Sequence, residues 1–231
     1  MRTNYDRQLK KLNDEMVEMG SMIEGVIEKA IKALVNQDVD LAQEVIRRDD
    51  QIDQQEKDIE SLCFKLLLME QPVATDLRQV SSALKMVTDM ERIGDHAENF
   101  ANYTKTEIKH NTGLTGDAKE EINKMYTAVS KLLKLSLECF MEQDGVNKPE
   151  EKLAEIAILE ASIDKMERRY QKHHIKRLAK GECEPRAGLL FSDMLSELER
   201  IADHSVNIAY SMSDEDEDCL LYTSPSPRDR G

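Results

Sequence analysis

One stretch of this sequence occurs twice, and this repeat constrains the fold more than any other feature. Residues 89–101 and residues 197–209 share a Glu-Arg-Ile-x-Asp-His core that is followed by Asn and Ala, and matching residues lie 108 positions apart. In a chain of 231 residues, a repeat of so long a period indicates the duplication of a domain-sized unit. We therefore expect two similar halves, each with one copy of the motif.

Apolar residues recur at steps of three and four through both halves, which is the period of amphipathic α-helices. Aromatic residues make up only 4% of the chain, and nine Gly and five Pro provide few helix breakers, so the helices should be few and long. Short connections between long helices favour antiparallel bundles. The pattern predicts an all-α fold of two tandem, structurally similar three-helix bundles, with six long helices at about residues 3–36, 39–71, 73–110, 116–142, 149–180 and 185–212.

The Gly/Thr-rich stretch 111–116 is the best candidate for the boundary between the halves. We expect the first bundle at residues 1–112 and the second at residues 116–213. The segment 214–231 has no helical period and contains two Ser-Pro steps. We expect this segment to be a disordered tail or a non-native extension that takes no part in the fold.

Composition argues against several classes of protein. The formal net charge of −14 is unsuited to a nucleic-acid surface, and the longest apolar run, residues 66–69, is far too short to span a membrane. The N-terminus shows no apolar signal region, and the four cysteines lack the spacing of a metal knuckle or redox pair, so we expect free thiols. No nucleophile is paired with a base, and no Gly-rich phosphate loop is present. We expect a cytoplasmic protein that is not an enzyme.

The motif places acidic residues beside the apolar stripe of its helix. Glu91 and Asp95 lie one turn apart on this flank, and Asn99 lies one turn further on. The second copy places three residues in the same way: Glu199, Asp203 and Asn207. Carboxylate and amide oxygens suit hard or borderline cations. We predict one metal site in each half, formed by the acid pair of each copy with the asparagine as a weaker ligand. The ion would be divalent or iron-type: Fe, Mn, Mg or Zn.

One helix supplies too few ligands for a cation, so a neighbouring helix must supply the others. Candidate ligands lie on the second helix of each bundle: Asp49, Asp50, Asp53 and Glu56 in the first, and Glu160, Asp164 and Glu167 in the second. The sequence leaves open which of these side chains face the motif helix. Alternatively, the motif acids are ordinary ion-pair partners of the adjacent arginines. We expect surface or interhelical hydrogen bonding, not ligation, for His96 and His204, and solvated side chains for His110, His173 and His174.

Three runs of the sequence resemble the PhoU family. The runs QPVATDLR at residues 71–78 and MERIGDHA at residues 90–97 are similar to its first half, and LERIADHSVNIA at residues 198–209 is similar to its second half. The resemblance implies two similar three-helix bundles, often dimeric, in the bacterial cytoplasm. It also implies a negative regulator of phosphate uptake and of the phosphate-starvation response. Such a regulator acts between the ATPase subunit of the phosphate ABC transporter and the phosphate-sensing histidine kinase.

The metal clusters of that family use a repeated Glu/Asp-x-x-x-Asp pattern. By resemblance, this pattern carries over to the acid pair in each copy of the motif. Lys85 in the first half matches Asp193 in the second, so the two sites need not be equivalent.

Three functions remain open at this point. The leading hypothesis is a non-enzymatic adaptor whose acidic, metal-binding faces dock basic or metal-bridged surfaces of the transporter ATPase and the kinase. The alternative is a cytosolic metal-binding or storage protein without a regulatory role. The third is a spectrin-like spacer that has no site.

Overall fold

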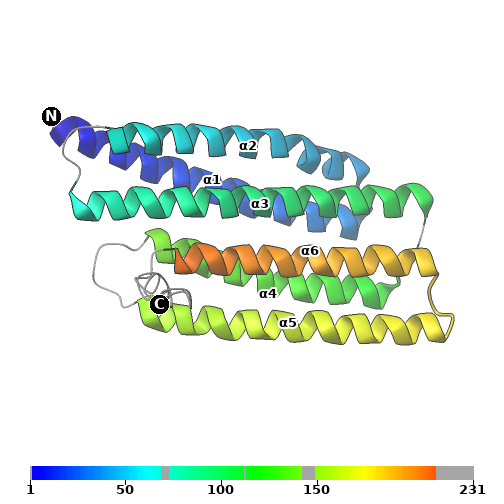
Figure 1. The fold of residues 1–231 in the computed structure, drawn as a ribbon. Coiled ribbons are helices and arrows are strands. Elements are labelled where there is room, and N and C mark those ends of the chain that lie inside the picture. The colour runs from blue at the N-terminus through cyan, green and yellow to red at the C-terminus, as the bar shows by residue number, and fades with distance from the viewer. Residues whose placement is uncertain (1, 69–72, 112, 142–148, 212–231) are drawn as a thin grey trace, which may run out of the picture.

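A computed structural model describes residues 2–68, 73–111, 113–141 and 149–211 of the chain. Within these ranges the chain forms helices and no strands (Figure 1). The helices are α1 (Arg2–Asn36), α2 (Val39–Leu68), α3 (Ala74–His110), α4 (Gly116–Met141), α5 (Pro149–Ala179) and α6 (Pro185–Tyr210). The predicted all-α fold with six long helices is therefore confirmed. The segment 214–231 lies outside the described residues.

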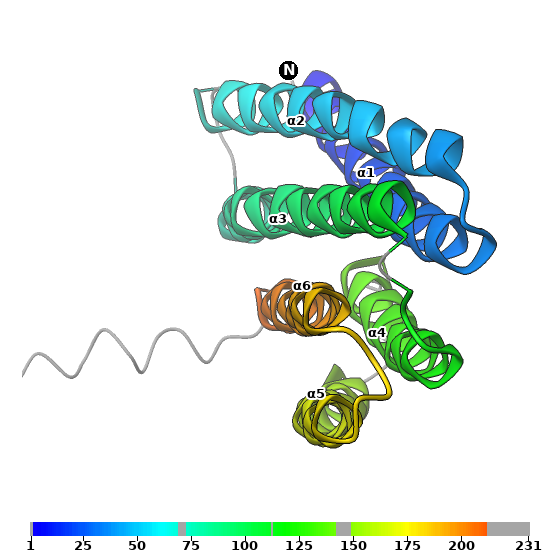
Figure 2. The same cartoon turned by 90° about the vertical axis from the view of Figure 1, so that its right-hand side faces the viewer.

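The six helices form two bundles that lie against each other. Helices α1 to α3 make the first bundle and α4 to α6 the second, and α3 and α6 run side by side between them (Figures 1 and 2). Helix α1 also packs on α4. Among the described helices, α2 contacts only α1 and α3, and α5 contacts only α4 and α6. Each bundle thus has one outer helix, and the doubled motif occupies the two helices at the centre.

Buried side chains follow the apolar stripes that the helical period predicts. On α3, the residues Val87, Met90, Ile93, Ala97 and Phe100 are at most 2% exposed. Buried apolar residues of all six helices join into one hydrophobic cluster that runs through both bundles. Because burial of apolar area is the main favourable term in folding, the two bundles stabilise each other.

Short, locally determined connections set the direction of the helices. Asp38 accepts a hydrogen bond from the backbone N–H of Leu41 at 2.9 Å, which caps the start of α2. Helix α3 ends at His110, and the capping residue Asn111 has a φ of 45°, in the left-handed region that asparagine tolerates. Gly181 has a φ of 70° just after α5, and Pro185 starts α6, where no helical N–H is needed. The two motif helices are thereby placed next to each other.

Two expectations about the chain's environment can be compared with the described residues. No helix among them is both long enough and apolar enough to cross a bilayer. Among the described residues, no disulfide joins Cys63, Cys139 or Cys183, and Cys219 lies outside the described residues.

Candidate metal sites

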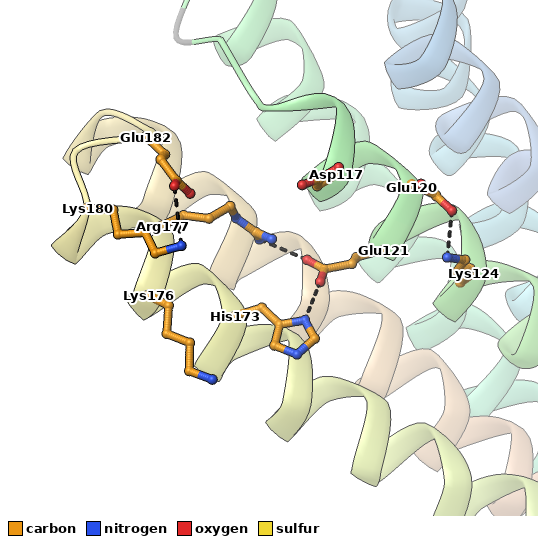
Figure 3. Close-up of a pocket in the computed structure, with 9 residues that line it drawn as sticks. All are labelled: Asp117, Glu120, Glu121, Lys124, His173, Lys176, Arg177, Lys180 and Glu182. Atoms are coloured by element: carbon orange, nitrogen blue, oxygen red, sulfur yellow. Dashed lines mark hydrogen bonds and ion pairs between the residues drawn. The ribbon is translucent and has the colours of Figure 1, made fainter.

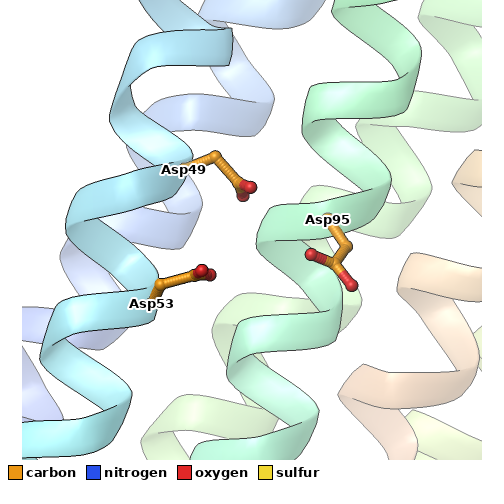
Figure 4. Close-up of side chains that lie close together, drawn as sticks. All are labelled: Asp49, Asp53 and Asp95. Carbon is orange, nitrogen blue, oxygen red and sulfur yellow. The ribbon is translucent and has the colours of Figure 1, made fainter.

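A cluster of carboxylates lies where α2 packs against α3. One oxygen from each of Asp49, Asp53 and Asp95 lies within 4.8 Å of the other two, and Figure 4 shows the α2 carboxylates pointing across to α3. This spacing is close to that of oxygen ligands around one cation, which lie about 2.0–2.6 Å from the ion. Together with their acidic neighbours, these residues make up what we call the first acidic face: Asp49, Asp53 and Glu56 of α2, and Glu91, Asp95 and Glu98 of α3.

Asp49 is the member of this face that most needs a partner. Its Oδ1 atom is buried and, in the described residues, accepts no hydrogen bond. Burial, followed by the nearby charges of Glu98, Asp95, Asp53 and Glu91, raises the pKa of Asp49 to about 7. A buried carboxylate oxygen without a donor is energetically unfavourable, and a bound cation would supply the missing charge. The residues present therefore fit a cation.

Gly94 explains how α3 comes so close to the acids of α2. A Cβ atom on residue 94 would lie 3.1 Å from two carbon atoms of Ile52 and 3.3 Å from Oδ1 of Asp49. The absence of a side chain at this variable position of the motif lets the two helices approach. The second copy has Ala202 at the matching position, so only the first copy has a residue without a side chain there.

Two further acids of the first face, Glu91 and Glu56, also have raised pKa values. Burial, followed by Asp95, raises the pKa of Glu91. Burial, followed by Glu91, raises the pKa of Glu56. The charged forms of these two carboxylates are thus disfavoured by partial removal from water and by like charges nearby. The face is arranged so that added positive charge would be stabilising.

Arg92 contacts the motif acids from the solvent side. Its Nη1 atom lies 3.0 Å from Oδ2 of Asp95, and its Nε atom lies 3.6 Å from Oε2 of Glu91. These contacts match the ion-pair interpretation of the motif. However, the Arg92 side chain is 55% exposed, so such pairs contribute little to stability, and they leave Oδ1 of Asp49 without a partner.

A second acidic face lies between α5 and α6, and we define it by Glu160, Asp164, Glu167, Glu199 and Asp203. Burial, followed by Asp203, Glu167 and Asp164, raises the pKa of Glu199. Partial removal from water, followed by Asp164, raises the pKa of Asp203, although this side chain remains exposed. Within the described residues, three convergent carboxylate oxygens occur on the first face only. The two faces therefore share residue types but differ in geometry.

Three other polar residues of the motif contact the opposite bundle: His96, His204 and Asn207. Asn207 donates a hydrogen bond to Oδ1 of Asp89 at 3.0 Å, toward the first bundle, and Asn99 is half-buried on α3. Metal ligation by either asparagine stays a prediction. His96 and His204 each hydrogen-bond to an acid of the opposite bundle, which confirms the expected interhelical role.

A charged hollow lies elsewhere, between α4 and α5, and has a volume of about 370 Å³ (Figure 3). At its base, Glu121 lies 2.7 Å from Nδ1 of His173 and accepts a hydrogen bond from Arg177 at 2.8 Å. Besides His173, the lining holds four acidic and four basic side chains, so it has no net charge to attract an ion: Asp117, Glu120, Glu121 and Glu182, and Lys124, Lys176, Arg177 and Lys180.

The expectation of a solvated side chain is wrong for His174 and holds only in part for His173, whose side chain is 44% exposed. His174 is 6% exposed, its ring centroid lies 5.0 Å from that of Phe191, and burial lowers its pKa. His173 is half-buried against Glu121. Helix α5 packs on both α4 and α6, so two consecutive residues can each face a neighbouring helix. His110 is exposed, as expected.

Fold and site together define a duplicated helical-bundle protein with one carboxylate-rich face in each bundle. A family model described as "PhoU domain" matches residues 16–104 and matches again at residues 122–212. The chain belongs to the PhoU family.

Individual relatives match along nearly the whole chain. A phosphate-specific transport system accessory protein PhoU homolog from Clostridium acetobutylicum is 31% identical over 208 residues, which cover 90% of this chain and 91% of the relative. A homolog of the same description from Pseudomonas aeruginosa is 32% identical and covers 89% of this chain and 82% of the relative.

Solved structures agree with the fold. The crystal structure of PhoU from Pseudomonas aeruginosa has a TM-score of 0.81 at 28% identity, covering 90% of this chain and 96% of that one. The phosphate transport system regulatory protein PhoU from Streptococcus pneumoniae has a TM-score of 0.79 at 26% identity, covering 90% and 94%.

Proposed function

We propose that this chain is an accessory protein of a phosphate-specific transport system and a negative regulator of phosphate uptake and of the phosphate-starvation response. It acts in the cytoplasm as a non-enzymatic adaptor between the ATPase subunit of the phosphate ABC transporter and the phosphate-sensing histidine kinase. We propose a homodimer as the working unit.

The observation that carries this proposal is similarity over the full length of the fold. Relatives described as phosphate-specific transport system accessory proteins match both bundles at about one third identity, and a phosphate transport system regulatory protein shares the arrangement of the helices. A duplicated chain with two outward acidic faces suits an adaptor, because each half can contact one partner.

The acidic faces supply the proposed binding chemistry. On the first face, Asp49, Asp53 and Asp95 would hold a cation, with Glu91 beside them. On the second face, Glu199 and Asp203 would do so with the acids of α5. When bound, a cation of the Fe, Mn, Mg or Zn type supplies positive charge that compensates the mutual repulsion of the carboxylates. The loaded faces would then dock basic or metal-bridged surfaces of the two partners.

Deleting the gene tests the regulatory proposal. In high phosphate, a reporter of phosphate-responsive transcription should be repressed in the parent strain and active in the deletion strain, and the wild-type gene should restore repression. A deletion strain that keeps the reporter repressed contradicts the proposal. A pull-down of the transporter ATPase with the purified chain, at high and at low phosphate, tests the adaptor role separately.

Metal storage is the competing function, and the partnerless Oδ1 atom of Asp49 is the observation that favours it. The two functions are separated by one variant that removes both acid pairs: Glu91→Ala, Asp95→Ala, Glu199→Ala and Asp203→Ala. If this variant loses its metal and also fails to restore repression, metal serves regulation. If it loses its metal but restores repression fully, the acidic faces are not part of the regulatory mechanism.

A further inference from the structure

Two polar pairs join the bundles where α3 and α6 run side by side (Figure 2). Nδ1 of His96 lies 2.6 Å from Oε2 of Glu197, and Nδ1 of His204 lies 2.8 Å from Oδ1 of Asp89. All four residues belong to the doubled stretch, and the two histidines occupy matching positions, as do the two acids. The pairs are therefore reciprocal, since each motif supplies a histidine to the other motif and an acid in return.

These pairs are shielded from water and are in contact with each other. The side chains of His96 and Glu197 are 12% and 6% exposed, and those of His204 and Asp89 are 25% and 20% exposed. The two imidazole rings are stacked, with centroids 5.4 Å apart. Hydrogen bonds to a shielded carboxylate are strong and directional. Apolar surfaces alone tolerate sliding, whereas a polar pair within an apolar interface fixes register.

The same helical turns that carry these pairs also carry the motif acids. Asp95 directly precedes His96 on α3, and Asp203 directly precedes His204 on α6. On α3, Asp95 faces α2, whereas His96 contacts α6. Any rotation or shift of α3 that changes the distance between its acids and those of α2 must also move His96. Asp89 lies two turns before His96 and on the same side of α3, so the same movement would displace both histidine–carboxylate pairs.

We infer that the two reciprocal pairs form a register lock between the bundles, through which cation occupancy of one acidic face changes the cation affinity of the other. This inference rests on the proposed cation sites. His96, His204, Asp89 and Glu197 are positioning residues in this arrangement and do not contact the ion. The lock gives the histidine of each motif a physical role, which the acid pair alone does not explain.

Titration of the full chain with Mn²⁺ alone, followed by calorimetry, measures this coupling. Affinity at the second face is compared between the wild type, whose first face is loaded, and Asp53→Asn with Asp95→Asn, which removes two carboxylates of the first face. A chain with Glu199→Ala and Asp203→Ala identifies which heat signal belongs to the second face. We expect the Mn²⁺ affinity of the second face to differ by about five-fold or more between the wild type and the variant without those two carboxylates. About five-fold is the usual lower limit of coupling between sites.

The comparison is then repeated in a lock variant, His96→Leu with Glu197→Leu. This change exchanges the better-buried pair for apolar side chains and leaves no carboxylate of that pair without its partner. We expect Mn²⁺ still to bind at both faces, with the difference reduced to less than about two-fold. The exposed histidine at the end of α3 provides the matched control, His110→Leu, which should keep the coupling. If the lock variant fails to fold, His204→Leu with Asp89→Leu makes the same test through the other pair.

Three results of these titrations would contradict the register lock, the cation sites or both. Coupling that persists in a folded lock variant overturns the inference, because the two faces would then be coupled by long-range electrostatics or through the shared hydrophobic core. Mn²⁺ binding at both faces of the wild type without coupling overturns the lock and leaves the proposed cation sites standing. No Mn²⁺ binding by the wild type overturns the cation sites and the inference together, whereas the deletion test of phosphate regulation is unaffected.

Discussion

Gly94 of α3 lies so close to Ile52 of α2 that a Cβ atom at residue 94 would stand 3.1 Å from both the Cδ1 and the Cγ2 atoms of that isoleucine. Ile52 is fully buried and cannot easily move aside. This contact holds α3 against α2 at the level where Asp49, Asp53 and Asp95 converge. The geometry of the first acidic face therefore depends on a residue that has no polar group.

Adding one methyl group at this point should be unfavourable. Glycine in a helix interior is less stable than alanine by about 1 kcal/mol, but overpacking against Ile52 should cost about 1–3 kcal/mol. We expect Gly94→Ala to gain nothing or to lose stability in urea unfolding. The control is Gly25→Ala in α1, where an added Cβ meets no atom within 4 Å, and it should gain about 0.5–1 kcal/mol. Equal gains in both variants would contradict the proposed close contact.

The raised pKa of Asp49, about 7, predicts a pH-dependent effect in protein freed of metal by a chelator. Between about pH 4 and pH 7 the folded chain keeps a proton on Asp49 that the unfolded chain has released, so stability falls as pH rises through this window. Asp49→Asn stays neutral and should avoid this loss. Its advantage in urea unfolding should be small near pH 4 and reach about 1–2 kcal/mol at pH 8, a value reduced for solvent screening.

Asp50→Asn, on the exposed side of the same helix, is the matched control for this experiment and should show no such trend. An effect of Asp49→Asn that is the same at every pH would mean that the carboxylate is not held in its neutral form by its surroundings.

The Glu121–Arg177 pair predicts a large structural effect away from the acidic faces. Arg177 is 8% exposed and Glu121 is 9% exposed, so Glu121→Ala leaves a buried guanidinium without its carboxylate. We expect a loss of about 3–5 kcal/mol in chemical unfolding. Glu120→Ala removes the neighbouring exposed pair with Lys124 and should leave stability nearly unchanged. A small loss in both variants would mean that the hollow between α4 and α5 admits enough water to solvate the arginine.

Periodicity was sufficient to predict the helices, because each helix buries one continuous stripe. The stripe through Val87, Met90 and Ile93 follows directly from steps of three and four, and the burial of these residues bears it out. The position of Glu91 and Asp95 beside that stripe follows in the same way. A helical wheel shows which residues of one helix share a face, so the buried and acidic faces of α3 could be predicted from the sequence.

Relations between helices were not accessible in this way. Whether Asp49 or Asp50 faces α3 depends on the rotation of α2 about its axis. The apolar residues of α2 define that rotation only to within about the angle between two consecutive residues. The burial of His174 depends on α5 lying between two neighbouring helices. The role of Gly94 at the variable motif position became clear only once α3 was placed against Ile52 of α2.

The metal content of the purified chain tests the central claim most directly. Elemental analysis is made on the wild type and on the variant with Glu91, Asp95, Glu199 and Asp203 all changed to alanine, after both have been incubated with Mn²⁺ and passed through a desalting column. We predict that the wild type retains stoichiometric metal and that the variant, with its helical content unchanged by circular dichroism, retains almost none. Equal metal content in the two proteins, or none in either, would contradict the assignment of the acidic faces as cation sites.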